Sequence, residues 1–296
     1  MLKKIATNLL DIAYDEQGET DGWPVVLLHG FPYDIHAYED VAPRLISQGA
    51  RVITPFLRGY GPTRFLASAT LRSGQQAALG ADLLSLLDAL QIEQAVLGGY
   101  DWGGRAACVV AALYPSRARG LVSVNGYNIQ NIATAMRPAG PEKEHRMWYQ
   151  YYLHGERGRT GLTENRRAFC RLLWSLWSPT WGFDDDTYAC SAAAFDNPDF
   201  VDVVVHSYRH RFGLVDGDPQ FDDMESRLSS MPSITVPTIT LEGDADGVTP
   251  LGRQADLKRF TGRHENRVVP NAGHNLPQEA PEAFAAAVLD INAWAD

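Results

Sequence analysis

Hydrophobic positions along the chain fall into short apolar runs that alternate with segments of helical spacing. Runs of this length predict buried strands, and leucines three and four residues apart predict a packed helix. Regular alternation of the two predicts an α/β fold, with a mostly parallel central sheet flanked by helices. Strands are predicted at residues 25–28, 51–55, 95–97 and 121–124, with helices at 73–90 and 105–113.

The pattern changes in the middle of the chain. Residues 129–232 lack strand-like runs, are rich in tryptophan and tyrosine, and are predicted to be mainly helical. We therefore expect a core made of residues 1–128 and 233–296, interrupted by a helical cap at 129–232. After the cap, strands are predicted at 236–241 and 267–269, and helices at 251–260 and 281–294.

Composition and charge exclude several functions. The net charge of −10 disfavours nucleic-acid binding, which needs clustered lysine and arginine. No apolar run is long enough to span a membrane, and Asp11 and Asp15 argue against a signal peptide. Three cysteines without a CxxC pair predict a reduced, cytoplasmic chain.

No cofactor and no metal are expected. His206 and His210 share a helix face, but they lack the carboxylates that would complete a metal site. Oligomeric state is left open by the sequence, with a homodimer as one assembly compatible with it.

A glycine-rich turn at 99–104 follows the strand at 95–97 and opens a helix. Its small residues allow a tight turn that exposes the central side chain, Asp101. A serine occupies this place in G-x-S-x-G enzymes. The N–H groups of Trp102 and of Phe31, in the loop after the strand at 25–28, are predicted to form an oxyanion hole.

Two further loops carry the partners that such a nucleophile needs. Asp246 follows the strand at 236–241 and can orient a histidine; Asp244 is the alternative, at a less usual spacing. His274 follows the last strand. The order nucleophile, acid, histidine, each at the end of a strand, is that of the α/β-hydrolase fold.

A carboxylate nucleophile favours particular substrates. It is ionised at neutral pH and can attack a saturated carbon that bears a leaving group. The product is an ester of Asp101, which water activated by His274 would hydrolyse. Epoxides and alkyl halides fit this chemistry better than carboxylic esters.

The sequence resembles the epoxide hydrolases of the α/β-hydrolase superfamily over essentially its whole length. The resemblance lies in residues 29–32, 58–61, 99–104, 243–246 and 273–274, although Tyr100 stands where the family usually has histidine. It implies that two cap tyrosines, Tyr149 and Tyr208, protonate the epoxide oxygen, with Tyr152 as the alternative to Tyr149.

The aromatic residues of the cap predict a largely apolar pocket, so a small apolar epoxide is expected as substrate, with water as the second reactant. The residues expected to line the pocket are His29, Pro32, Trp148 and Tyr152.

Two other functions stay open. Haloalkane dehalogenases resemble the chain at Asp101 and Trp102 but usually carry asparagine where Phe31 stands. Fluoroacetate dehalogenases share residues 29–32 and a tyrosine like Tyr208. Trp102 stands where they have the arginine that binds the substrate carboxylate, directly after the nucleophile, whereas Arg105 could match their second arginine. A chain that has lost its chemistry and only binds ligands is the remaining alternative, which the complete set of Asp101, Asp246 and His274 disfavours.

Overall fold

The computed structural model describes residues 2–252 and 257–294. Its centre is a nine-stranded sheet in the order β1-β2-β4-β3-β6-β7-β8-β9, with β5 paired to β2. The bounds are β1 Leu2–Ala6, β2 Leu10–Gln17, β3 Trp23–Leu28, β4 Ala50–Pro55, β5 Arg64–Phe65, β6 Ala95–Gly99, β7 Ala118–Val124, β8 Thr238–Gly243 and β9 His264–Val269.

From β4 across to β9 the strands are parallel, and the apolar residues of β4, β3, β6, β7 and β8 belong to one core, to which β9 contributes Val269. The strands predicted from apolar runs are all present, each one to three residues longer than predicted except that at 236–241, which is shifted by two residues. β1, β2 and β5 were not predicted; β2 pairs antiparallel with β1, β4 and β5. The predicted fold class is thus confirmed, with an antiparallel edge added.

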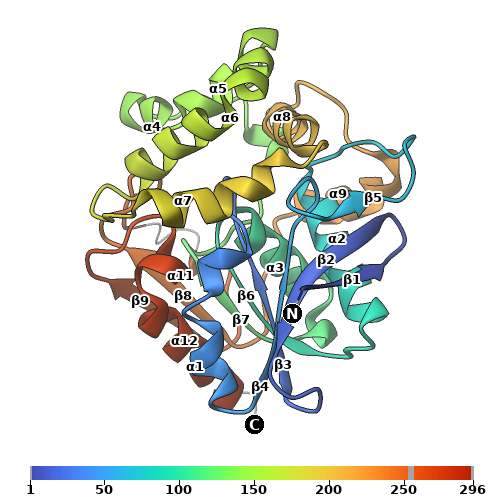
Figure 1. Cartoon of the computed structure of the whole chain (residues 1–296), viewed down its shortest axis with the longest axis vertical. Helices are drawn as coiled ribbons and strands as arrows, with labels where there is room; N and C mark the ends of the chain where they lie inside the picture. The colour runs from blue at the N-terminus through green and yellow to red at the C-terminus, as the bar shows by residue number, and fades with distance from the viewer. Residues whose placement is uncertain (1, 253–256, 295–296) are drawn as a thin grey trace.

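Helices cover both faces of the sheet (Figure 1). α1 (Ala42–Ile46) and α12 (Pro281–Trp294) lie on one face, and α2 (Gln76–Ala89) and α3 (Asp101–Leu113) lie on the other. The short α11 (Leu276–Glu279) precedes α12. The helix predicted at 251–260 includes residues 253–256, which lie outside the described residues.

Between β7 and β8 the chain is helical. It forms α4 (Pro141–Arg146), α5 (Trp148–Tyr152), α6 (Glu156–Trp177), α7 (Asp185–Ala192), α8 (Phe200–His210) and α9 (Asp222–Ser229), besides short 3-10 turns. Helices α4 to α8 lie above the carboxyl ends of the parallel strands (Figure 1), whereas α9 packs against α2 and α3. We refer to α4–α8 as the cap helices.

None of the helices in the described ranges combines the length and the apolar character required to cross a membrane.

Candidate active site

The turn between β6 and α3 presents Asp101 at the carboxyl end of the sheet. Asp101 has φ +48°, in the left-handed region that side chains rarely adopt, as expected for a sharp strand-to-helix turn. Gly103 lets α3 approach β3 closely, because a Cβ there would lie 2.0 Å from the Leu28 carbonyl oxygen. Backbone geometry therefore fixes where the carboxylate points.

The two carboxylate oxygens of Asp101 have different surroundings. Oδ1 accepts a hydrogen bond from the Phe31 N–H at 2.8 Å, whereas Oδ2 lies 3.7 Å from Nε2 of His274. The second distance is too long for a hydrogen bond. The Trp102 N–H belongs to the first turn of α3, where N–H groups have no partner within the helix. One oxygen is thus held, and the other faces the histidine.

His274 is oriented by Asp246. Its Nδ1 lies 2.9 Å from Oδ2 of Asp246, and the Asp246 side chain is fully buried. The remaining Asp246 oxygen accepts from the N–H groups of Val248 and Thr249 at 2.7 and 2.9 Å. Asp244 instead accepts from the Asn271 N–H. The geometry therefore favours Asp246 over Asp244 as the acid.

Charges within this group reinforce one another. Burial acts to lower the pKa of His274, but Asp246 and Asp101 override it and raise that pKa to about 10. Burial likewise opposes ionisation of Asp101, yet His274, Arg105 and the Phe31 N–H bring its pKa below the ordinary value. The resting site therefore holds a carboxylate beside an imidazolium at neutral pH.

Two tyrosines from the cap helices meet above Asp101. The rings of Tyr149 (α5) and Tyr208 (α8) lie 5.4 Å apart, edge to face, and Tyr208 also contacts Phe31 and Trp102 at 5.4 and 6.0 Å. The Tyr208 hydroxyl is buried without a hydrogen-bond partner in the described part of the chain. Burial raises the pKa of Tyr149 to about 12, so both phenols remain protonated.

The α/β hydrolase fold family matches residues 24–281. The chain belongs to this family.

Across 99% of its length and 97% of the other chain, this α/β hydrolase superposes on a Klebsiella pneumoniae structure that carries a provisional epoxide hydrolase name, with 46% identity and a TM-score of 0.97. It is 26% identical to epoxide hydrolase A of Mycobacterium tuberculosis, over 97% of this chain and 95% of that relative. A haloalkane dehalogenase of Psychrobacter cryohalolentis is 27% identical, over 95% and 87%. An epoxide hydrolase of Caballeronia sordidicola is 33% identical, but the match covers 49% of this chain and 44% of that relative. The predicted family and hydrolase class are therefore confirmed.

The other residues predicted for the site of this α/β hydrolase take several positions. His29 is fully buried and engages two backbone groups: Nε2 accepts from the Leu57 N–H at 3.1 Å, and Nδ1 lies 2.9 Å from the Gly30 carbonyl. Burial lowers its pKa to about 4, so it is neutral. The Pro32 carbonyl accepts from the Trp174 indole of α6 at 2.7 Å. Both residues thus connect loops beneath the cap helices.

Trp148 and Tyr152 lie together around Phe169. Their rings are 5.9 and 5.8 Å from the Phe169 ring and 6.2 Å from each other. Trp148 also touches Tyr149 at 6.5 Å. The structure thus brings Tyr149, rather than Tyr152, into contact with Tyr208.

Three residues support the catalytic loops and were not predicted. Asn125, at the end of β7, donates to Oδ2 of Asp246 at 2.8 Å. Ser178, which follows α6, accepts from the His274 N–H at 3.1 Å and donates to Glu279 at 2.6 Å. Glu279 in turn accepts from the Gly273 N–H at 2.6 Å. Asn125 directly follows β7, the neighbour of the strand that leads to Asp246. This position at a strand end is the one sequence feature that could have indicated its role.

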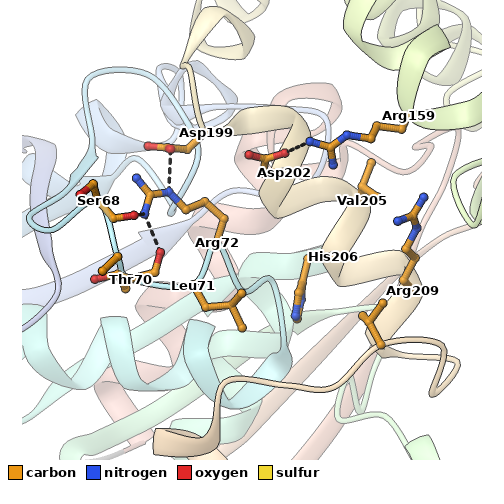
Figure 2. A pocket seen from close by; sticks show the side chains of 12 residues that line it. Ser68, Thr70, Leu71, Arg72, Arg159, Asp199, Asp202, Val205, His206 and Arg209 are labelled. Atoms are coloured by element: carbon orange, nitrogen blue, oxygen red, sulfur yellow. Dashed lines mark hydrogen bonds and ion pairs between the residues drawn. The ribbon is translucent and has the colours of Figure 1, made fainter. Parts of the chain in front are cut away.

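A cavity of about 590 Å³, which we call the outer cavity, lies between α8 and residues 68–72 (Figure 2). It is lined by charged side chains that already pair: Arg72 with Asp199 at 2.8 Å, and Arg159 with Asp202. None of Asp101, His274, Tyr149 or Tyr208 lines it. Its volume alone therefore does not mark it as the reaction site.

Proposed function

We propose that the protein is an epoxide hydrolase that opens an epoxide to a vicinal diol through an ester on Asp101. The supporting observation is the pair of protonated phenols above a carboxylate nucleophile. Opening an epoxide creates an alkoxide that needs a proton, and a buried phenol can supply it. The full-length relatives named epoxide hydrolases agree with this choice.

In the first step, Oδ2 of Asp101 attacks a ring carbon of the epoxide. The carbon–oxygen bond of the ring breaks, and the oxygen takes a proton from Tyr149 or Tyr208. Tyr149 is suited to this because its oxygen accepts from Nε2 of Gln150 at 2.9 Å, which leaves its own proton for the substrate.

In the second step, water attacks the carbonyl carbon of the Asp101 ester. Ester formation removes the negative charge of Asp101, one of the two charges that raise the pKa of His274. His274 can then give up its proton, which returns through water to the tyrosinate left by the first step. The neutral imidazole, held by Asp246, takes a proton from the attacking water. The Phe31 and Trp102 N–H groups stabilise the oxyanion, and its collapse releases the diol and restores Asp101.

A dehalogenase is the second candidate because of one observation. The indole Nε1 of Trp102 is buried beside the nucleophile and has no hydrogen-bond partner among the described residues. A weak donor of this kind suits a halide leaving group. Phe31 cannot supply the second donor from its side chain, which favours the epoxide.

Turnover by purified protein decides between these functions. We expect hydrolysis of a chromogenic epoxide such as a nitrostyrene oxide, and its loss in Asp101→Asn, which keeps the shape of the turn. Absence of turnover on a panel of epoxides would contradict the proposal. Release of halide from haloalkanes or fluoroacetate, with the same Asp101 dependence, would establish the dehalogenase instead.

A further inference from the structure

Two arginines are buried next to the site without a carboxylate partner. Arg105 lies one turn into α3 after Asp101, and Arg211 directly follows α8; they are 6% and 9% exposed. Neither forms an ion pair within residues 2–252 and 257–294; Arg105 donates from Nε to the Asn128 carbonyl at 3.4 Å, a long hydrogen bond. Arginine is almost never fully buried unless it is paired, because removing its charge from water costs several kcal/mol.

The fold pairs a buried arginine elsewhere. Arg58, 1% exposed, binds both oxygens of Asp82 at 2.6 and 2.7 Å and the Ser73 carbonyl at 2.7 Å. By contrast, Nη1 of Arg211 makes one long bond to the Gln150 side chain at 3.4 Å. The contrast indicates that Arg211 has a role other than packing.

The free donors of Arg211 form one edge of its guanidinium. Nε and Nη2 are both buried and have no partner in the described part of the chain. These two N–H groups are parallel and match the spacing of two carboxylate oxygens. The guanidinium carbon lies 4.5 Å from the centre of the Tyr208 ring, which places the Arg211 side chain against one member of the tyrosine pair.

Arg105 adds a second positive charge. Burial, and then repulsion by Arg211, lower the pKa of Arg105 to about 10, while Asp101 acts in the opposite sense. Glu225 interacts electrostatically with Arg105 but forms no ion pair with it in the described chain. Its carboxylate oxygens accept hydrogen bonds from the Gln75 and Gln76 side chains and from the Ala77 N–H. Two like charges near one another in a buried site would be stabilised by an anion.

We propose that the substrate carries a carboxylate, bound by the Nε–Nη2 edge of Arg211 with Arg105 adding attraction. The inference rests on the proposed function and narrows it to epoxy acids. It replaces the small apolar epoxide expected from the aromatic cap. Binding the carboxylate at Arg211 would hold the epoxide under the hydroxyls of Tyr149 and Tyr208.

The test compares epoxy carboxylates of increasing chain length with their primary amides, which have nearly the same shape but no charge. For wild type we expect a higher kcat/KM on at least one acid than on its amide. In Arg211→Met, kcat/KM on that acid should fall roughly 10- to 100-fold, the worth of a charged hydrogen-bonded contact, with little change on the amide. Arg211→Lys should recover part of the preference because it keeps the charge but not the fork.

Arg209→Met is the matched control. Arg209 lies in the last turn of α8, two residues before Arg211, and lines the outer cavity (Figure 2). It pairs with Glu156 at 2.9 Å. Its substitution should leave the ratio of acid to amide unchanged. Thermal unfolding of each variant separates lost binding from lost folding.

Three results would overturn the inference. One is that wild type hydrolyses each amide with the same kcat/KM as the corresponding acid. Another is that kcat/KM of Arg211→Met falls by the same factor on the acid and on the amide, which would mean that Arg211 acts on the acidity of the tyrosines. If neither substrate class is turned over, the proposed function fails, and a binding measurement then tests the inference. A saturating epoxy acid should raise the Tm of wild type more than it raises the Tm of Arg211→Met. An equal rise in both proteins would overturn the inference.

Discussion

The two steps of the ester mechanism depend on different side chains, so residue substitutions separate the steps. In His274→Ala the attack by Asp101 remains, but no base activates the water. We expect the Asp101 peptide to gain the mass of one substrate molecule, visible by mass spectrometry after a single turnover. His274→Ala combined with Asp101→Asn is the control and should gain none. An unmodified peptide in His274→Ala would exclude the covalent route.

The tyrosine pair should act in the first step and not the second. Removing one hydroxyl in Tyr149→Phe or Tyr208→Phe removes one of two acids, and we expect ester formation to slow by about 10- to 100-fold. The rate of ester hydrolysis should change little. Rapid-quench measurement of the two rates checks this, and Tyr152→Phe, whose ring lies against Phe169, is the control. Equal slowing in all three variants would remove the distinction between Tyr149 and Tyr152.

At the scale of elements, the approach of α3 to β3 determines where Asp101 points. In Gly103→Ala the added methyl group would meet the Leu28 carbonyl oxygen at 2.0 Å, so the helix must move. We expect the free energy of unfolding to fall by about 1–3 kcal/mol and activity to fall further than stability. Urea unfolding and kcat/KM measure the two. Gly182→Ala is the control, because nothing lies within 4 Å of its added Cβ.

Elements with a clear hydrophobic period were predictable, and those whose form depends on neighbours were not. β3 and β6 are apolar throughout because helices cover both of their faces. β1 is largely exposed, so its sequence LKKIA carries no such pattern. The helix predicted at 73–90 begins only at Gln76.

The same distinction applies to the site. Asp101, Asp246 and His274 follow predicted strands, and the carboxyl ends of parallel strands meet at one edge of the sheet. Ser178 and Arg211 come from the segment between β7 and β8. Ser178 bonds to His274 and Glu279, and Arg211 bonds to Gln150, all distant in the sequence. No local pattern reveals such contacts, so they required the three-dimensional structure.

At the scale of the whole molecule, the end of α6 joins the cap helices to the catalytic loops. The Trp177 carbonyl accepts from the N–H groups of Gly247 and His274 at 3.0 and 3.2 Å, and Ser178 bonds to His274 and Glu279. One cap segment thus holds the loops of both the acid and the histidine.

Ser178→Ala should therefore affect catalysis more than folding. We expect about 1 kcal/mol lower stability from the lost hydrogen bonds, and a loss of kcat of about tenfold because His274 is less well placed. Thermal unfolding and steady-state kinetics check the two effects. Ser175→Ala is the control. Within the described residues, the Ser175 hydroxyl donates only to the Arg171 carbonyl, on the exposed side of α6. A drop in kcat that is no larger in Ser178→Ala than in Ser175→Ala would contradict this role.

The junction at Trp177 and Ser178 also limits how caps can be exchanged between members of the family. A graft that took the whole cap from a relative would change the partners of His274 and Glu279 together with the pocket walls. Selectivity is therefore better altered by replacing α4, α5 and α8 while the end of α6 stays with its own loops. Recombination designed along this division should yield active chimaeras more often than exchange of the cap as a single block.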